Sequence, residues 1–322
     1  MTAREKTVKA NGVDLFVRER GAGRPLLLIN GIGGNADMWG PLEERLAGNA
    51  TTVVFDTPGA GRSSTPRRPL SISDFASSAG SLLDELGHSE VDVLGFSFGG
   101  LVAQELAHRQ PKRVRRLALV ATACGWGSKP GTMASLALIT MPVRYHSRTV
   151  YERTNRLLSP ADAGLVDRLP HLTEARLRYP PPLLGYGFQM MAGMFWSSLT
   201  WLHTVQVPTL VLAGSLDHLI PPANGVQLAR LLPKARLHIL EEEGHLFVLD
   251  PASPSHPLLQ DFFGAEELGA SPAWSTGRVV DDDAEVEDAL RNSIGSKPHG
   301  ALSDAYRRYV LSSQRRGRGT AL

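Results

Sequence analysis

A serine inside a Gly-x-Ser-x-Gly motif is the clearest sign of chemistry in this sequence. The motif spans residues 95–99, with Ser97 at its centre, and it lies between an apolar run at 91–94 and a helical pattern at 101–108. In a nucleophile elbow the chain turns sharply from a strand into a helix and exposes the serine Oγ, and glycines two positions away on each side avoid a collision. We therefore expect Ser97 to act as a nucleophile.

A serine nucleophile needs a base that takes its proton and an acid that orients the base. In hydrolases with this elbow the chain order is serine, acid, histidine, and the last two residues follow later strands. Asp217 comes three residues after the apolar run 209–214, and His245 follows the run 236–240. The other nine histidines lack such a placement. The predicted catalytic residues are Ser97, Asp217 and His245.

Two backbone N–H groups must stabilise the oxyanion that a serine attack creates. The residue after the nucleophile, Phe98, supplies the first. The second should come from the glycine-rich loop 30–34, which follows the apolar run 25–30, and Ile32 is the predicted donor.

The same loop also fits a competing interpretation as a dinucleotide site. Residues 31–36 match G-x-G-x-x-A, and Asp56 ends the next predicted strand 20 residues later. However, another strand at 13–18 precedes the supposed first strand. A nucleotide site would also leave the hydrolase order of the three predicted catalytic residues as a coincidence. No metal-binding motif is present, so we expect neither a cofactor nor a metal.

Strands and helices alternate along most of the chain, which predicts an α/β fold with a mostly parallel sheet and helices on both faces. The predicted strands are 13–18, 25–30, 51–56, 91–95, 117–121, 209–214 and 236–240. The predicted helices are 72–86, 99–109 and 223–232, and Ser71 with Asp74 predicts an N-terminal cap for the first.

The alternation stops at about residue 122 and resumes near 204. This insertion is rich in methionine and aromatic residues, which suits either an adaptable apolar surface or a second small helical core. The domain prediction is a core formed by 1–121 and 204–263, a helical cap at 122–203, and a C-terminal tail at 264–322. The tail contains an acidic block at 281–288, and we expect it to be largely disordered apart from a helix near 303–312.

Composition excludes several classes of protein. The chain has 322 residues, a formal charge of +2 and one cysteine, so it lacks the charge typical of nucleic-acid binding and cannot form an internal disulfide. No apolar run reaches the roughly 18 residues of a membrane span, and the N-terminus lacks a secretory pattern. We expect a cytoplasmic protein with no nucleic-acid partner and no transmembrane segment.

Specific segments of the chain resemble the α/β-hydrolase superfamily over about residues 13–263 and, within it, the intracellular depolymerases of medium-chain polyhydroxyalkanoates. These segments are 29–34, 55–66, 94–100, 195–203 with 208–214, and 244–247. The resemblance implies a serine enzyme that hydrolyses 3-hydroxyacyl esters at storage granules. It also implies that Ser97, Asp217 and His245 match the catalytic motifs of that family.

The sequence thus predicts a carboxylic ester hydrolase, with the polyester substrate and the granule partner implied by the resemblance. Three alternatives stay open: a small-ester hydrolase, a carbon–carbon bond hydrolase, and a binding protein on the same fold without catalytic activity. A haloalkane dehalogenase is disfavoured because its nucleophile is an aspartate.

Overall fold

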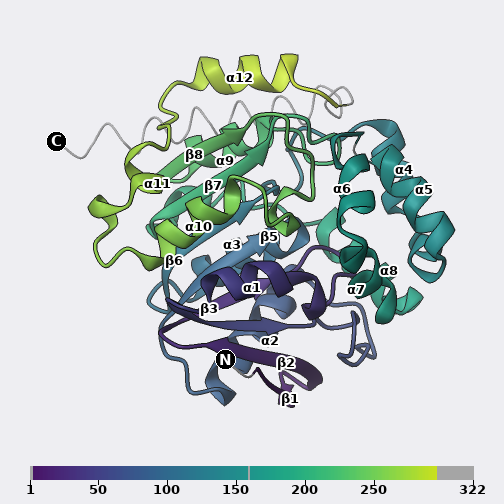
Figure 1. Ribbon diagram of the computed structural model, residues 1–322. Helices are drawn as coiled ribbons and strands as arrows, with labels where there is room; N and C mark the ends of the chain where they lie inside the picture. Colours follow the sequence, from purple (N-terminus) through teal and green to yellow (C-terminus); the bar gives the residue numbers. More distant parts are fainter. Residues whose placement is uncertain (1–2, 159, 296–322) are drawn as a thin grey trace.

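The computed structural model describes residues 3–158 and 160–295, and its centre is a sheet of eight strands (Figure 1). In spatial order the strands are β1 (Arg4–Ala10), β2 (Val13–Gly21), β4 (Ala50–Phe55), β3 (Arg24–Ile29), β5 (Val91–Phe96), β6 (Val114–Val120), β7 (Thr209–Gly214) and β8 (Ala235–Leu240). The six strands from β4 to β8 run parallel, and β2 pairs antiparallel with both β1 and β4. The predicted α/β fold with a mostly parallel sheet is confirmed.

The central strands are buried along their whole length and mostly apolar because both faces of the sheet are covered. Every residue of β5 and of β7 is buried. Such continuous apolar runs are typical of parallel strands. The strand β1 was not predicted, because it alternates charged and polar residues at the exposed edge of the sheet. The sequence did contain a signal for this strand, the dipeptide Asn11-Gly12, which is typical of a tight β-hairpin turn. Both residues have the positive φ that such a turn requires.

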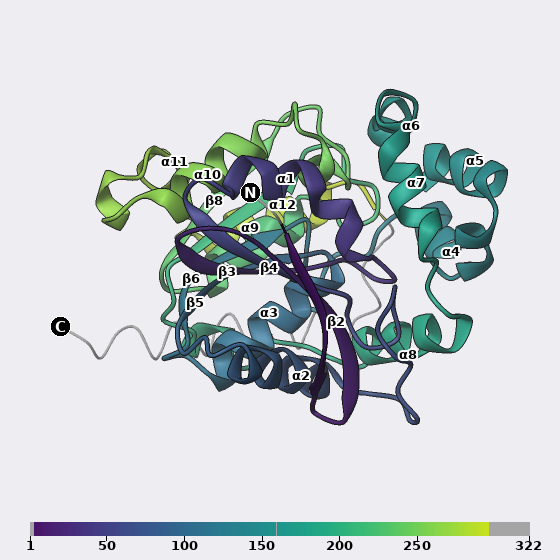
Figure 2. The same ribbon diagram turned by 60° about the horizontal axis from the view of Figure 1, so that its bottom comes forward.

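Helices cover the two faces of the sheet in separate groups (Figure 2). On one face lie α1 (Gly40–Leu46), α10 (Ser255–Gly264) and α11 (Pro272–Ser275). On the other face lie α2 (Ile72–Glu85), α3 (Phe98–Arg109), α9 (Ala223–Leu231) and α12 (Asp283–Asn292). The N-terminal capping box predicted for helix α2 is confirmed. Ser71 Oγ accepts the N–H of Asp74, and an Asp74 carboxylate oxygen accepts the N–H of Ser71.

A group of short helices between β6 and β7 lies to one side of the sheet (Figures 1 and 2). They are α4 (Met133–Ile139), α5 (Arg148–Leu158), α6 (Ala163–Arg168), α7 (Pro170–Arg178) and α8 (Leu183–Met194), with 3-10 turns η2 (Pro142–His146) and η3 (Pro160–Asp162). All of them fall within residues 122–203, and we call this segment the cap. Further 3-10 turns lie elsewhere: η1 (Ala36–Trp39), η4 (Leu202–Thr204), η5 (Phe247–Leu249) and η6 (Leu268–Ala270).

The first half of the C-terminal tail differs from the prediction of disorder. Here α11 and α12 pack on the core, and Leu237 of β8 forms a β-bridge with Arg278. On α12, Val286 and Leu290 are four residues apart and both are buried, which contributes about 1.5–3 kcal/mol for each side chain. The prediction of disorder was based on the composition of the whole tail, in which these few apolar residues are outnumbered by acidic ones. The helix predicted at 303–312 lies outside the described residues.

In the segments that the structure describes, no helix is both long and apolar enough to span a bilayer.

Candidate active site

Ser97 lies at the turn between β5 and α3, and its backbone is strained. Its φ of 54° and ψ of −118° form a conformation that residues with a side chain rarely adopt. A β-carbon on Gly99 would overlap the carbonyl oxygen of Ile29, and one on Gly95 would overlap the carbonyl oxygen of Gly99. Thr122 Oγ1 donates to the Ser97 carbonyl at 2.7 Å. The motif glycines therefore allow the close packing that holds Ser97 in this conformation.

The structure brings Ser97, His245 and Asp217 into one hydrogen-bonded chain. His245 Nε2 lies 3.1 Å from Ser97 Oγ, and His245 Nδ1 lies 2.7 Å from Asp217 Oδ2. The loops after β7 and β8 position the acid and the histidine, since parallel strands end at the same edge of a sheet. A carboxylate only accepts hydrogen bonds, so Nδ1 must hold the proton and the Nε2 lone pair faces the serine hydroxyl. This is the arrangement that general-base catalysis requires.

The carboxylate of Asp217 is held firmly in place. Its second oxygen, Oδ1, accepts the N–H groups of Leu219 at 2.9 Å and Ile220 at 2.8 Å, and the side chain is fully buried. With both oxygens engaged, the carboxylate cannot turn away from the imidazole without losing hydrogen bonds.

Negative charge around His245 sets its protonation. Burial by itself favours the neutral ring, but the charge and hydrogen bond of Asp217 outweigh burial, and Asp162 adds to the effect, so the pKa of His245 is raised above its usual value. The same two carboxylates favour the protonated form of the His245 imidazole.

Asp162 is a site residue that sequence analysis missed. It comes from η3 of the cap, and its carboxylate accepts the backbone N–H of His245 at 2.8 Å and that of Leu246 at 3.2 Å. Burial raises the pKa of Asp162 to about 6, although His245 opposes the shift. No motif marks Asp162, because its partner is 83 residues away in the sequence. The cap thus holds the histidine loop directly.

The predicted oxyanion donors lie beside the serine. Ile32 and Phe98 line cavities that also contain Ser97. Over residues 3–158 and 160–295, no protein acceptor pairs with the backbone N–H of either residue. Asn30 shapes the loop: its Oδ1 accepts the N–H of Gly31 at 3.0 Å, and its Nδ2 donates at 2.7 Å to the carbonyl of Asn35. The two N–H groups are therefore available to a substrate oxygen.

Two cavities meet at Ser97. The smaller one has a volume of about 50 Å³, and we call it the arginine pocket; its lining includes Ser97, Tyr145, Arg144, Asn155, Arg176 and His245. The larger one has a volume of about 350 Å³, and we call it the apolar cavity; its lining includes Phe98, Leu101, Trp126, Met190, Met194 and Leu219. Only the arginine pocket contains His245. A substrate bound at Ser97 can therefore contact the apolar cavity on one side and the two arginines of the arginine pocket on the other.

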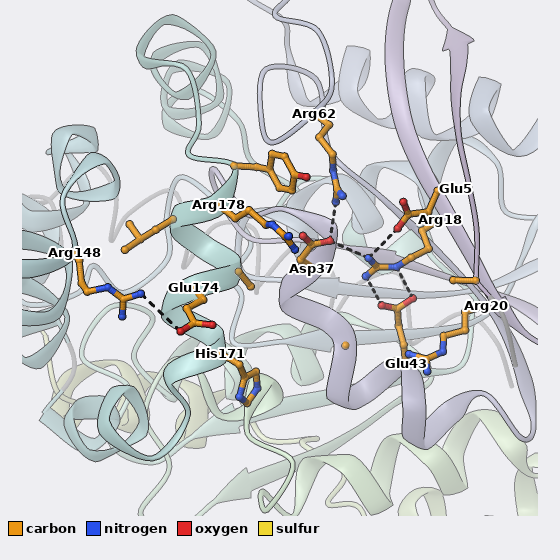
Figure 3. Close-up of a pocket in the computed structure, with 15 residues that line it drawn as sticks. Glu5, Arg18, Arg20, Asp37, Glu43, Arg62, Arg148, His171, Glu174 and Arg178 are labelled. Atoms are coloured by element: carbon orange, nitrogen blue, oxygen red, sulfur yellow. Dashed lines mark hydrogen bonds and ion pairs between the residues drawn. The ribbon is translucent and has the colours of Figure 1, made fainter.

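A third cavity, of about 1030 Å³, does not contain Ser97 and separates the N-terminal strands from helix α7 of the cap (Figure 3). Many of the side chains that line this cavity form ion pairs with one another. Arg18 bonds to Glu43 at 2.5 Å and to Asp37 at 2.9 Å, and Arg62 bonds to Asp37 at 3.0 Å. Because these paired charges neutralise one another, this cavity offers little net charge to a ligand.

The structure does not support the dinucleotide interpretation of the loop after β3. Asp56, the residue expected to bind a ribose, is fully buried. Its carboxylate accepts the N–H of Ala36 at 2.6 Å and that of Arg62 at 2.7 Å. Both oxygens are used inside the protein. In the described ranges, no three His, Cys, Asp or Glu side chains are grouped in a way that could hold a metal ion.

Comparisons with known proteins agree with this architecture. Residues 24–146 match the family model described as the alpha/beta hydrolase fold. A poly(3-hydroxyalkanoate) depolymerase from Ectopseudomonas oleovorans is 38% identical over 248 residues, which cover 76% of this chain and 86% of that protein. A 2-hydroxymuconate semialdehyde hydrolase from Pseudomonas sp. (strain CF600) is 27% identical, covering 82% of this chain and 95% of that protein.

A similar fold is found among solved structures. The enol-lactonase from Burkholderia xenovorans LB400 superposes with a TM-score of 0.66 at 27% identity, covering 81% of this chain and all of the other.

Proposed function

Because the chain belongs to the alpha/beta hydrolase family, we propose that it is a serine hydrolase that cleaves carboxylic esters, with poly(3-hydroxyalkanoate) or its oligomers as substrate. The observation that supports the reaction is the continuous hydrogen-bonded chain from Asp217 through His245 to Ser97. The polyester substrate is supported by the depolymerase relative at 38% identity and by the apolar cavity beside Ser97, which suits alkyl side chains.

In the proposed reaction His245 Nε2 takes the proton of Ser97 Oγ as that oxygen attacks the ester carbonyl carbon. The N–H groups of Ile32 and Phe98 bind the oxyanion, and such a donor contributes about 10²–10³ to turnover. The bond to the alcohol oxygen then breaks, and His245 gives its proton to that oxygen. Water next attacks the acyl-enzyme and gives a proton to His245, which returns it to Ser97 as the acid leaves.

Labelling with a fluorophosphonate tests the nucleophile. We expect covalent modification of Ser97, found by peptide mapping, and no labelling of the Ser97→Ala variant. Modification of another residue would refute the site. If neither protein is labelled or turns over an ester while binding to polymer persists, the chain is a binding protein and the proposal fails.

A carbon–carbon bond hydrolase or a small-ester hydrolase is the second candidate, supported by the 2-hydroxymuconate semialdehyde hydrolase relative at 27% identity. Substrate profiling separates the candidates. We expect 3-hydroxyalkanoate oligomers to have a higher kcat/KM than short nitrophenyl esters or vinylogous diketone substrates. The reverse order would favour the second candidate.

We further propose that the protein works at the polymer surface of storage granules. Apolar side chains of the cap are unusually exposed: Phe195 is 83% exposed, Leu184 60% and Met194 58%. Met194 also lines the apolar cavity, so the exposed side chains continue into the site. Exposed apolar groups that gather around a cavity are typical of interaction surfaces.

Sedimentation with medium-chain polyester granules tests this surface. The double variant Leu184→Ser/Phe195→Ser should bind at least about tenfold more weakly, given the free energy of burying each side chain. Val279→Ser, which changes an apolar residue outside the cap that is 52% exposed, is the control. Equal binding of both variants would contradict the proposed surface.

A further inference from the structure

Two buried arginines share the arginine pocket with the serine and the histidine. Arg144 comes from η2 and Arg176 from α7, and they are 1% and 6% exposed. In the part of the chain that the structure describes, neither forms an ion pair with an Asp or Glu side chain. A buried guanidinium without a carboxylate partner is costly, so such groups are rare unless they bind something.

Several hydrogen-bond donors of these side chains have no partner among the residues that the structure describes. Arg144 donates from Nη2 to Asn155 Oδ1 at 3.0 Å, but its Nε and Nη1 atoms are buried and unpartnered. Arg176 donates from Nη2 to the Ile32 carbonyl at 2.8 Å, and its Nε is unpartnered. Asn155 Nδ2 is also buried and unpartnered. The pocket thus contains several unused donors and two positive charges.

Aromatic rings hold the two guanidinium groups in place. Arg176 lies 4.2 Å from the ring centre of Tyr145, and Arg144 lies 5.2 Å from Tyr145 and 5.5 Å from Tyr151. Burial would raise the pKa of Tyr145, yet the charges of Arg176 and Arg144 outweigh burial and hold it below its usual value. The positive potential in the pocket therefore acts on neighbouring groups.

The cavity in Figure 3 is lined by two further arginines, which are partly buried. Arg18 and Arg62 are each paired with carboxylates of the protein, whereas within residues 3–158 and 160–295 neither Arg144 nor Arg176 forms an ion pair with a carboxylate. Arg116, which is 4% exposed, also forms no ion pair within those residues, but it donates to the backbone carbonyls of Phe262 and Glu266. Arg144 and Arg176 differ from these three arginines because they keep buried donor atoms without a hydrogen-bond partner among the described residues, and a negatively charged ligand would supply one.

We propose that Arg144, with Arg176 and Asn155 beside it, binds a free carboxylate on the alcohol portion of the ester substrate. A volume of about 50 Å³ exceeds the roughly 10–15 Å³ that is needed to hold one water molecule, so the pocket has room for a small group such as a carboxylate. The departing alcohol receives its proton from His245, and of the two cavities at Ser97 only the arginine pocket contains His245. The alkyl groups then occupy the apolar cavity.

This inference rests on the proposed function and makes its substrate more specific. In a 3-hydroxyacid oligomer the alcohol portion of the last ester carries the terminal carboxylate, separated from the ester oxygen by only two carbon atoms. A pocket that binds this carboxylate selects the last ester bond. The enzyme therefore removes single hydroxy acids from the carboxyl end of the chain.

A pair of matched substrates tests the proposal: a 3-hydroxyalkanoate dimer with a terminal carboxylate, and the same dimer with a terminal carboxamide. The unmodified protein should have a kcat/KM about 10- to 100-fold higher for the carboxylate, mainly through KM, as hydrogen bonds to a charged group imply. In Arg144→Gln the ratio should fall to near 1. Because each ratio is measured within one protein, partial loss of folded protein does not affect it.

Arg148→Gln is the matched control, since Arg148 also belongs to the cap but is exposed and pairs with Glu152. It should keep the ratio of the unmodified protein. A second measurement needs no variant: 3-hydroxybutyrate should inhibit competitively at least about tenfold more strongly than 3-hydroxybutyramide.

The inference is overturned if the unmodified protein cleaves both dimers equally well, or if Arg144→Gln retains the preference. In either case ester cleavage still occurs, so the proposed function stands. If neither dimer nor any other ester is cleaved, the proposed function itself has failed.

Discussion

The two halves of the site, one from the sheet and one from the cap, are held in different ways. Ser97, Asp217 and His245 follow the ends of strands and satisfy one another with hydrogen bonds of 2.7 and 3.1 Å. On the cap side, Arg144 and Arg176 have buried donor atoms that find no acceptor in residues 3–158 and 160–295. A group that performs chemistry must be oriented before the substrate arrives, whereas a group that recognises substrate must keep unused hydrogen-bonding capacity.

The difference has a structural origin. Ser97, Asp217 and His245 follow strands β5, β7 and β8. Each of these strands is hydrogen-bonded to neighbouring strands or packed under helices, so its end has little freedom to move. The cap consists of helices of 6 to 12 residues. Helices this short depend on tertiary packing for their stability. We therefore expect substitutions on the sheet side to lower kcat and substitutions on the cap side to act mainly on KM.

The largest effect expected is that of Ser97→Ala. Without the nucleophile, kcat should fall by about 10⁵ or more, while KM for an oligomer stays similar because the cavities are intact. Ser77→Ala, on the surface of α2, is the control and should behave as the unmodified protein. Initial rates under saturating substrate measure the loss. Residual turnover above about 1% would assign the chemistry to another residue.

Asp217→Asn should have the next largest effect. The amide can donate to Nδ1 and so favour the wrong tautomer, which lowers kcat by about 10⁴ in serine hydrolases. Asp250→Asn is the control, because it changes a carboxylate near the histidine loop that pairs with Arg168 at 2.9 Å and not with His245. It should change kcat by less than about tenfold. Equal losses in the two variants would contradict the orienting role of Asp217.

Asp162→Ala probes the contact between the cap and the loop that carries His245. Removing this carboxylate leaves two backbone N–H groups of the histidine loop without acceptors, and we expect kcat to fall by about tenfold. Asp162→Asn keeps an acceptor oxygen and should recover much of the loss. If Asp162→Ala were as damaging as Asp217→Asn, the division between sheet and cap would be wrong.

The smallest effect expected is a shift in pH dependence. His245 must be neutral to act as a base, and its raised pKa places the acid limb of kcat/KM above pH 6.5, with activity lost as pH falls. Asp162 contributes to that raised value, so Asp162→Asn should move the limb to lower pH by a fraction of a unit. A profile of kcat/KM from pH 5 to 9 measures this. A shift to higher pH would show that Asp162 does not act through its charge.

Local pattern was sufficient for the elements of the sheet. The strands from β2 to β8 each contain an apolar run bounded by turn residues. The N-terminal capping box of helix α2 follows from the spacing of Ser71 and Asp74. The edge strand β1 was missed because edge strands need no apolar run, and α12 was missed because two apolar residues were outnumbered by acidic ones.

The sequence by itself determined the fold class and named Ser97, Asp217 and His245 as a group, because each of them follows a recognisable strand in a fixed chain order. Only the tertiary structure decided which cap residues reach them. Asp162, Arg144 and Arg176 meet the site through contacts between segments far apart in the chain, for example 144 residues between Arg176 and Ile32. Such contacts leave no local periodicity or motif, since they depend on how short helices dock against a sheet.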